Sequence, residues 1–394
     1  MNNGVFVPCQ SLERCCGCGL CQNICQNKAI KLVLSTEGFL VPTIDSAICI
    51  NCGLCSKKCL SNSISKSAFS LRNPLFYYAF SNDKKIRASS ASGGIASTIY
   101  NVAIDLSWYV CGVTYKNNNL VFLLTNEREK IHYFSSSKYI QSNPTDIYLE
   151  IKKIIDSGKF VFFVGTPCQV YALKALVGNP DNLFTADLVC YGVGSERFYK
   201  DYLSSFNKNK DSKIENFIFR KKICGTLNSF SIIKFDNGVE KKKMFYTSVF
   251  GKLFSKHLIT RKSCDNCPFD CYNRVGDITL GDYVENNSKL PISELKKGCS
   301  LVRINSVKGE KLFKLIEDRI SFDTILEKDI KTFLVRQGSN HLITSNRDAF
   351  FKDYTEYGYN YCVKKYYNIS RRELIRMRFC YFLKAIKRIV KRKE

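Results

Sequence analysis

Two short cysteine runs with the same internal spacing constrain the fold of this chain more than any other feature. They consist of Cys15, Cys18, Cys21 and Cys25, and of Cys49, Cys52, Cys55 and Cys59. In the C-x-x-C-x-x-C-x-x-x-C pattern, three cysteines hold one 4Fe-4S cluster and the fourth reaches a neighbouring cluster. The spacing therefore predicts two clusters, one held by Cys15, Cys18, Cys21 and Cys59 and the other by Cys49, Cys52, Cys55 and Cys25.

Two other interpretations of these runs are a pair of zinc knuckles and a disulfide lattice. A zinc site needs only four ligands, and the doubled run contains no histidine. The residues at 1–10 lack the charged and apolar regions of a signal peptide, so the 20 cysteines are expected in a reducing cytoplasm. The proline that commonly follows the fourth cysteine is replaced by Gln26 and Leu60, which leaves the ligands unchanged.

Length and charge limit the classes of protein that this chain can represent. Its 394 residues predict two or three domains, and no stretch is as long as a transmembrane helix. The net charge of +25 fits nucleic-acid binding, an anionic membrane surface or solvated lysine-rich faces. Because no zinc finger, RNP signature or helix-turn-helix pattern accompanies the charge, we expect no nucleic-acid partner.

The chain is expected to combine α+β and α/β architecture. The predicted division is a two-cluster ferredoxin-like domain over 1–62, the N-terminal part of a mixed α/β domain over 75–145, its C-terminal part over 146–310, and a helical basic tail over 311–394. In the first domain, 30–34 and 38–42 predict a hairpin over the clusters. A serine-rich link is expected at 61–70.

A βαβ unit is predicted in the middle of the chain. The apolar run at 160–164 is typical of a strand buried on both faces, a helix follows over 168–177, and 183–190 forms the next strand. The two strands should be parallel with a right-handed crossover. Cys168 and Cys190 then lie at the same carboxyl edge of the sheet, where ligands bind in open α/β folds. The start of the helix would also stabilise a thiolate at Cys168.

A third set of cysteines consists of Cys264, Cys267 and Cys271. By itself this spacing fits a zinc site or a redox dithiol equally well. Sites made only of thiolates favour zinc or iron–sulfur. We predict a third 4Fe-4S cluster, for which Cys168, Cys190, Cys264 and Cys267 are the candidate ligands. The spacing does not decide which cysteine is the fourth ligand or what Cys271 does.

Hydrophobic periodicity predicts further elements around this unit. A helix is expected at 95–106 after Ser92, Gly93 and Gly94, with strands at 108–115 and 120–124. Short strands are expected at 217–220, 230–235 and 243–246, and Asn237-Gly238 predicts a hairpin turn between the last two.

The end of the chain predicts a basic amphipathic helix. Ser370 and Glu373 form a capping box. Apolar residues recur behind it at Ile375, Phe379, Phe382, Ile386 and Ile389, and basic residues lie opposite at Arg376, Lys384, Lys387, Arg388 and Lys391. Such a helix suits an anionic membrane surface or an acidic partner. Alternatively, it packs its apolar stripe on the body of the protein.

Several motifs together resemble the coenzyme F420 hydrogenase/dehydrogenase beta-subunit family. They lie at 92–94, 137–142, 164–169, 187–192, 219–222, 261–267 and 277–282, and the resemblance covers about residues 1–310. Tyr191 stands where the family often has histidine, Tyr283 and Val284 replace Phe-Trp, and Cys271 is additional. These departures concern the electron acceptor more than the fold.

The resemblance implies a flavin-binding reductase domain that receives electrons through iron–sulfur clusters. It implies FAD near Ser92, Gly93, Gly94, Lys138, Tyr139, Gln141 and Thr166. A glycine-rich turn at a helix N-terminus also suits a pyrophosphate. None of His132, His257 and His341 lies in a motif, so no catalytic residue is assigned.

The expected function is therefore an iron–sulfur flavoprotein oxidoreductase. Its partners would be a ferredoxin-like electron donor or a partner redox subunit, and a small-molecule or carbohydrate-linked substrate. It would be cytoplasmic, with peripheral contact to an anionic membrane through the C-terminal helix. Two alternatives stay open: a non-catalytic electron-transfer subunit of a larger enzyme, and a membrane-associated accessory protein for polysaccharide modification.

Overall fold

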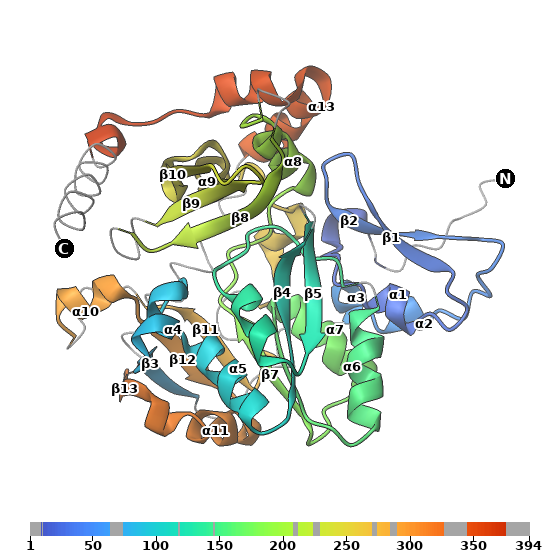
Figure 1. Ribbon diagram of the computed structural model, residues 1–394. Coiled ribbons are helices and arrows are strands. Elements are labelled where there is room, and N and C mark those ends of the chain that lie inside the picture. The colour runs from blue at the N-terminus through green and yellow to red at the C-terminus, as the bar shows by residue number, and fades with distance from the viewer. Residues whose placement is uncertain are drawn as a thin grey trace.

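The protein is built around one large mixed sheet. A computed structural model describes residues 9, 11–63, 74–116, 119–144, 146–207, 212–223, 229–269, 274–283, 290–326 and 345–375. The eight strands follow the order β13-β3-β12-β11-β7-β6-β4-β5 (Figure 1). Their bounds are β3 Leu75–Ser81, β4 Tyr109–Lys116, β5 Asn119–Thr125, β6 Val161–Gly165, β7 Leu183–Leu188, β11 Ile278–Asp282, β12 Ser300–Ile304 and β13 Ile320–Thr324.

The predicted βαβ unit forms the centre of this sheet and is confirmed. Strands β6 and β7 pair in parallel, and α7 (Pro167–Val177) connects them. Both strands are buried along nearly their whole length, which explains their continuous apolar sequence. The helix begins where it does because Thr166 and Gln169 form a capping box and Pro167 occupies the first turn.

Helices cover both faces of the sheet. On one face lie α5 (Ile95–Asp105) and α11 (Val307–Lys314), and on the other lie α6 (Ile147–Asp156) and α7. The helix predicted at 95–106 and the strands predicted at 108–115 and 120–124 are confirmed as α5, β4 and β5. The large domain is thus a mixed α/β structure with apolar cores on both sides of the sheet.

A second, smaller sheet packs above the first (Figure 1). It contains β8 (Ile214–Lys221), β9 (Phe230–Phe235) and β10 (Glu240–Met244), with α8 (Glu196–Ser204) and α9 (Val249–Ser255) against it. The strand predicted at 243–246 is wrong in its bounds. The tight turn at 237–238 starts the pairing at Glu240 opposite Lys234, and the chain leaves the sheet after Met244 as a 3-10 turn.

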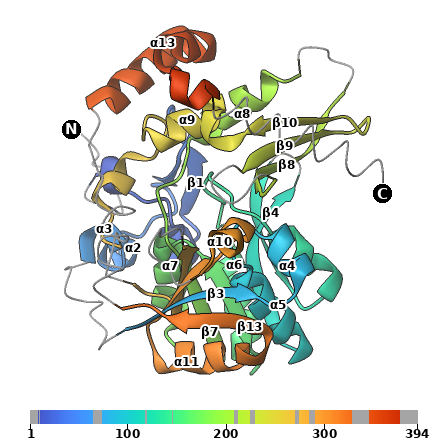
Figure 2. The ribbon, with the colours of Figure 1, turned by 90° about the vertical axis from the view of Figure 1, so that its left-hand side faces the viewer.

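The cysteine module packs on the side of the large domain (Figure 2). Its predicted hairpin is present as β1 (Ile30–Leu34) and β2 (Leu40–Ile44), two residues later in its second strand than expected. The short helices are α1 Leu20–Ile24, α2 Leu54–Lys57 and α3 Leu60–Ser63. In α1, Leu20 is buried in the core of the large domain, so the module and the body share apolar contacts.

The region predicted as a helical tail over 311–394 is wrong for its first part. Strand β13 pairs with β3 at the edge of the main sheet. Helix α13 (Ser345–Tyr366, kinked at Gly358) buries Phe350 and Tyr354 against α8, so apolar packing draws this segment into the body. The capping box of Ser370 and Glu373 is confirmed.

Some predicted features lie outside the described residues. They are the remainder of the basic helix at 376–394, most of the serine-rich link, Cys271 and His341. Within the described ranges, no helix combines the length and the apolar character needed to cross a bilayer.

Candidate active site and cysteine clusters

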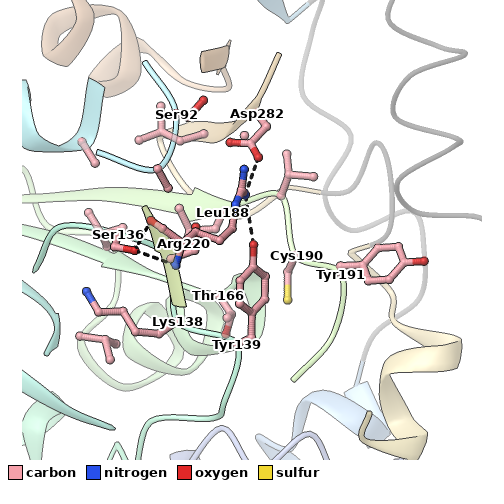
Figure 3. Close-up of a pocket in the computed structure, with 18 of the residues that line it drawn as sticks. Ser92, Ser136, Lys138, Tyr139, Thr166, Leu188, Cys190, Tyr191, Arg220 and Asp282 are labelled. Carbon is pink, nitrogen blue, oxygen red and sulfur yellow. Dashed lines mark hydrogen bonds and ion pairs between the residues drawn. The ribbon is translucent and has the colours of Figure 1, made fainter. Parts of the chain in front are cut away.

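A cavity of about 650 Å³ lies where the carboxyl edge of the main sheet meets the second sheet (Figure 3). The ends of β6, β7 and β11 contribute Gly165, Leu188 and Asp282, and the second sheet contributes Arg220. Ligand pockets commonly have volumes of about 300 to 1,000 Å³, so this cavity is large enough for a cofactor-sized molecule. Its place at the carboxyl ends of parallel strands is the one that open α/β folds use for binding.

Most residues that the family resemblance assigned to a flavin line this cavity. They are Ser92, Gly94, Lys138, Tyr139, Gln141 and Thr166. The first turn of α5 also faces the cavity through Ile95, Ala96 and Ser97, so backbone N–H groups and the helix dipole point toward it. Gly93 has a different position: an added Cβ would lie 2.4 Å from the Ala79 carbonyl oxygen, because the chain crosses β3 closely there.

The polar ends of two of these residues contact protein groups. The Lys138 Nζ donates to the carbonyl oxygens of Phe134 and Ser135 at 2.9 and 2.8 Å, and it caps the 3-10 turn that ends at Phe134. Burial lowers the pKa of Lys138 to about 7. The Gln141 amide nitrogen donates to the carbonyls of Cys16 and Gly17 at 2.8 and 2.9 Å. Both residues therefore shape the cavity wall through their own hydrogen bonds.

A buried arginine forms the polar centre of the cavity. The Arg220 Nη1 donates to the Tyr139 hydroxyl at 3.1 Å and to Asp282 Oδ2 at 2.6 Å (Figure 3). Ser136 Oγ donates to the Arg220 carbonyl at 2.8 Å. Burial raises the pKa of Tyr139, so its hydroxyl stays neutral and can both donate and accept.

Sequence reasoning did not place Arg220 or Asp282 in the site, although both lie in the quoted family motifs. The signal available was an arginine on the amphipathic strand β8 and an aspartate at the end of β11. Their pairing joins two sheets, and neither position reveals the other in the sequence.

Aromatic rings form the opposite end of the cavity. Tyr191, Tyr246 and Phe254 line it, and the ring of Tyr191 packs against His257 in a tilted arrangement with centroids 4.2 Å apart. Tyr191 is 36% exposed and lies at the mouth. This part of the cavity can accept a flat or apolar group next to the polar centre.

The structure brings Cys59 to the first cysteine run. Burial raises the pKa of Cys21 to about 12, and the next largest causes are the charges of Cys15 and Cys59. A hydrogen bond with the Cys9 thiol lowers the pKa of Cys15 to about 6. Thiols that perturb one another in this way are close neighbours, which is the arrangement needed for a shared cluster on the first run and Cys59.

The second run has the corresponding arrangement with Cys25. Burial raises the pKa of Cys55, and the nearby Cys25 and Cys52 thiols raise it further. Among cysteines in the described ranges, Cys52 is the exposed one. The second run therefore lies at the outer end of the module, and the first run lies at the end that faces the body.

The third predicted set also comes together. Burial raises the pKa of Cys267 to about 12, and the charges of Cys168 and Cys190 add to that rise. Burial also raises the pKa of Cys264, and the charges of Cys190 and Cys267 raise it further. Cys190 also lines the cavity, so this thiol group adjoins the candidate flavin site.

Backbone N–H groups point at the sulfur atoms of many predicted ligands. Burial raises the pKa of these thiols, and a backbone hydrogen bond to each opposes the rise at Cys21, Cys55, Cys59, Cys190, Cys264 and Cys267. For Cys190, the donor is Gly192 N at 3.4 Å. Such bonds stabilise thiolates, so the residues present fit iron–sulfur ligation.

The thiol groups do not have the geometry of single-ion sites. In the described ranges, no three His, Cys, Asp or Glu side chains are arranged to hold one metal ion. A zinc ion holds thiolates at about 2.3 Å. A cubane spreads its thiolates over four irons, so the ligands of a cluster need not meet at one point.

Two cysteines that the sequence analysis did not assign lie among these groups. Cys9 is buried and hydrogen-bonded to Cys15. Cys16 is hydrogen-bonded to both Cys18 and Cys168, which belong to the first and third predicted sets. In the sequence, only the position of Cys16 next to Cys15 pointed to this contact, and the C-x-x-C spacing assigns Cys16 no role.

A network of hydrogen bonds fixes the first cysteine run on the body. Arg261 donates to the carbonyls of Cys15 and Leu40 at 2.6 and 2.5 Å, and to Gln141 Oε1 at 2.9 Å. The Tyr148 hydroxyl donates to the Cys18 carbonyl at 2.9 Å. The first and third thiol groups are thus held side by side by buried polar contacts.

Two family models match separate parts of this chain. Residues 158–328 match the family model for the C-terminal part of the coenzyme F420 hydrogenase/dehydrogenase beta subunit, and residues 14–63 match the 4Fe-4S dicluster domain. No curated protein gives a significant match. A chain in a xenon derivative of the F420-reducing NiFe hydrogenase complex from Methanosarcina barkeri is 19% identical, with 75% of this chain and 96% of that chain covered and a TM-score of 0.48.

These matches relate the chain to an oxidoreductase family and indicate an iron–sulfur electron-transfer domain over residues 14–63. More specifically, residues 158–328 are similar to the C-terminal part of the coenzyme F420 hydrogenase/dehydrogenase beta subunit, and residues 14–63 in front of them are similar to a 4Fe-4S dicluster domain. The resemblance stated from the motifs is confirmed.

Proposed function

We propose that this protein is an iron–sulfur flavoprotein oxidoreductase that takes single electrons at its N-terminal module and delivers them to a substrate at the cavity. The observation that carries the proposal is the continuous series of thiols between the two. It runs from exposed Cys52 through the first run to Cys168 and ends at Cys190 in the cavity wall. Electron transfer between neighbouring centres needs such closely spaced ligands.

The residues of the cavity would bind and orient FAD. The first turn of α5, with Gly94 at a φ of +92°, offers backbone N–H groups to a pyrophosphate. Arg220 and Tyr139 offer donors to a ring that gains negative charge on reduction. The flavin would supply the conversion of single electrons into a hydride, and the clusters would supply the one-electron steps.

The protein itself contributes spacing and protection. Buried residues around Cys168, Cys190 and Cys264 exclude water from the third thiol group, and backbone N–H groups tune the thiolates. The aromatic mouth around Tyr191 and Phe254 would receive a substrate next to the flavin. We expect this substrate to be a small molecule or a carbohydrate-linked group.

Anaerobic purification with iron, zinc and flavin quantitation and a visible spectrum tests the proposal. We expect about twelve irons and one FAD per chain, since each cubane holds four irons. About eight irons without flavin would contradict it. Zinc in place of iron at any thiol group would contradict the ligand assignment of that group.

The second candidate is a non-catalytic electron-transfer subunit of a larger enzyme. The matched family is named for a beta subunit, which favours a partner chain. In that case, clusters would load, flavin would be absent, and deletion of 371–394 would abolish binding to the partner.

A further inference from the structure

The outer end of the cysteine module has an exposed apolar patch next to the second cysteine run. Ile48 and Ile50 are 46% and 70% exposed, and Ile50 lies between Cys49 and Cys52. Because Cys52 is itself exposed, this is where the predicted electron path reaches the surface. Exposed apolar side chains around a redox centre are typical of a surface that contacts another protein.

Lysines surround this patch. Lys28, Lys57 and Lys58 are exposed, and the Asn27 side chain donates to the Ile48 carbonyl at 3.4 Å, so the turn that carries Lys28 adjoins the patch. Lys57 is the last residue of α2 and Lys58 is its C-cap, two and three residues after Cys55. The second run is thus flanked by positive charge on both sides.

Two of the acidic residues of the module face the body of the protein. Glu13 forms an ion pair with Lys262 at 3.0 Å, and Glu37 pairs with Arg347 at 2.6 Å, so both face the body. In the described part of the module, 11–63, Asp45 is the remaining acidic residue, and its carboxylate accepts from Ala47 N. Asp45 is exposed and adjoins the patch, since Ile48 N donates to its carbonyl oxygen at 3.3 Å, so the side chains around the second run comprise three lysines and one aspartate.

We propose that this outer end, defined by Lys28, Ile48, Ile50, Cys52, Lys57 and Lys58, is the docking surface for a small acidic electron-carrier protein. The proposal rests on the proposed function, because it names the partner that feeds the same electron path. In each encounter, the redox centre of the carrier loses one electron and the cluster held by the second run gains it, and no bond forms or breaks. Opposite charges would steer the two surfaces together, and the apolar patch would exclude water at the contact.

Stopped-flow reduction of the anaerobic full-length holoprotein tests this surface. The probe is an acidic two-cluster ferredoxin, reduced in advance, and cluster bleaching is followed by visible absorbance. The double variant Lys57→Glu/Lys58→Glu should lower the second-order rate constant at low salt by about tenfold or more, because attraction becomes repulsion. The matched control Lys311→Glu/Lys314→Glu makes the same charge change on α11 and should leave the rate constant near that of the wild type.

A small reductant separates docking from damage to the cluster. Reduced methyl viologen is a cation that needs no docking surface, so it should reduce the Lys57→Glu/Lys58→Glu variant at least as fast as the wild type. The wild type offers a second measurement that needs no variant: added salt should slow reduction by ferredoxin and should not slow reduction by methyl viologen.

Two results would overturn the docking surface. One is equal ferredoxin rates in the wild type and the Lys57→Glu/Lys58→Glu variant with equal iron content. The other is an equal loss in the α11 control, which would show that net charge rather than this surface matters. Failure of the proposed function has a different signature, namely a wild-type protein that lacks iron or flavin before any donor is added.

Discussion

The cysteine module and the cavity show two different ways in which a sequence makes a site. In the module, eight predicted ligands lie within about 45 residues, and short spacings bring each set together. The cavity draws on segments from Ser90 to Ser300, and its polar centre joins a strand of each sheet. The module depends on local spacing, whereas the cavity depends on the packing of two sheets, so changes in the two regions should have separable effects.

The largest effect is expected from Cys52→Ala. It removes a ligand that no neighbouring residue replaces, so iron should fall by about four per chain and donor-driven activity should be lost. Flavin content should stay unchanged, because Cys52 lies at the far end of the module. Iron and flavin quantitation with the spectrum measures both, and Cys362→Ala in α13 is the matched control. Loss of flavin together with iron would show that the two regions are not independent.

The converse change is Arg220→Gln in the cavity. It removes a buried charge and leaves Asp282 without its ion partner, so we expect a loss of about 3 kcal/mol in the free energy of unfolding and a loss of bound flavin. Iron in the N-terminal module should remain. The control is Arg128→Gln, whose exposed pair with Asp105 should cost less than about 1 kcal/mol. Denaturant unfolding and cofactor content decide the result, and full flavin retention would contradict the role given to Arg220.

The contact between the two regions is tested by Gly17→Ala. Gly17 has a φ of +64°, and an added Cβ would lie 2.7 Å from both the Arg261 guanidinium and the Leu40 carbonyl oxygen. Overpacking of this kind costs about 1 to 3 kcal/mol. We expect both cofactors to load but electrons to pass more slowly from the module to the cavity, as single-turnover absorbance would show. Gly53→Ala is the control, because its φ is +72° but its Cβ meets open space. Equal slowing in both variants would attribute the effect to backbone strain.

The smallest effect is a pH dependence at Lys138. Burial lowers its pKa to about 7, and in the unfolded chain it returns to about 10.4. Between these values, the unfolded state binds more protons, so Lys138 should make the protein more stable as pH rises from about 7 to 10. The rise in Tm between pH 7 and 9 should be smaller in Lys138→Met. Lys130→Met, an exposed lysine on the same 3-10 turn, should behave like the wild type, and equal rises in all three proteins would contradict the shift.

The predictions from sequence succeeded where a local pattern was sufficient. The doubled cysteine run, the βαβ unit and the hairpin turn at 237–238 are each encoded within a few residues, and the dicluster domain and the family were both recognisable. The βαβ unit also placed Cys168 and Cys190 at one edge, since parallel strands bring their carboxyl ends together. The start of β10 was missed because cross-strand pairing, rather than the local propensity of four lysine-rich residues, sets its bounds.

The segment from 311 onward shows the limit of pattern reading more clearly. The sequence predicts a helical basic tail there, yet β13 completes the main sheet and Tyr354 is fully buried against α8. Strand β13 needs the edge of β3 to pair with, and α13 needs the apolar side chains of α8 to pack on, and both partners come from distant parts of the chain. The tail prediction is wrong for β13, because sequence reasoning about that segment alone does not include its pairing with β3.

The sequence by itself determined the βαβ unit, the dicluster module and the similarity to the F420 hydrogenase/dehydrogenase beta subunit, because each depends on spacing or periodicity along the chain. Tertiary structure decided that Gln141 and Arg261 hold the first run on the body, that Cys16 contacts both Cys18 and Cys168, and that Arg220 pairs with Asp282. The physical reason is that a cluster ligand needs neighbours a few residues away, whereas a buried charge needs a partner in space, which folding can bring from any part of the chain.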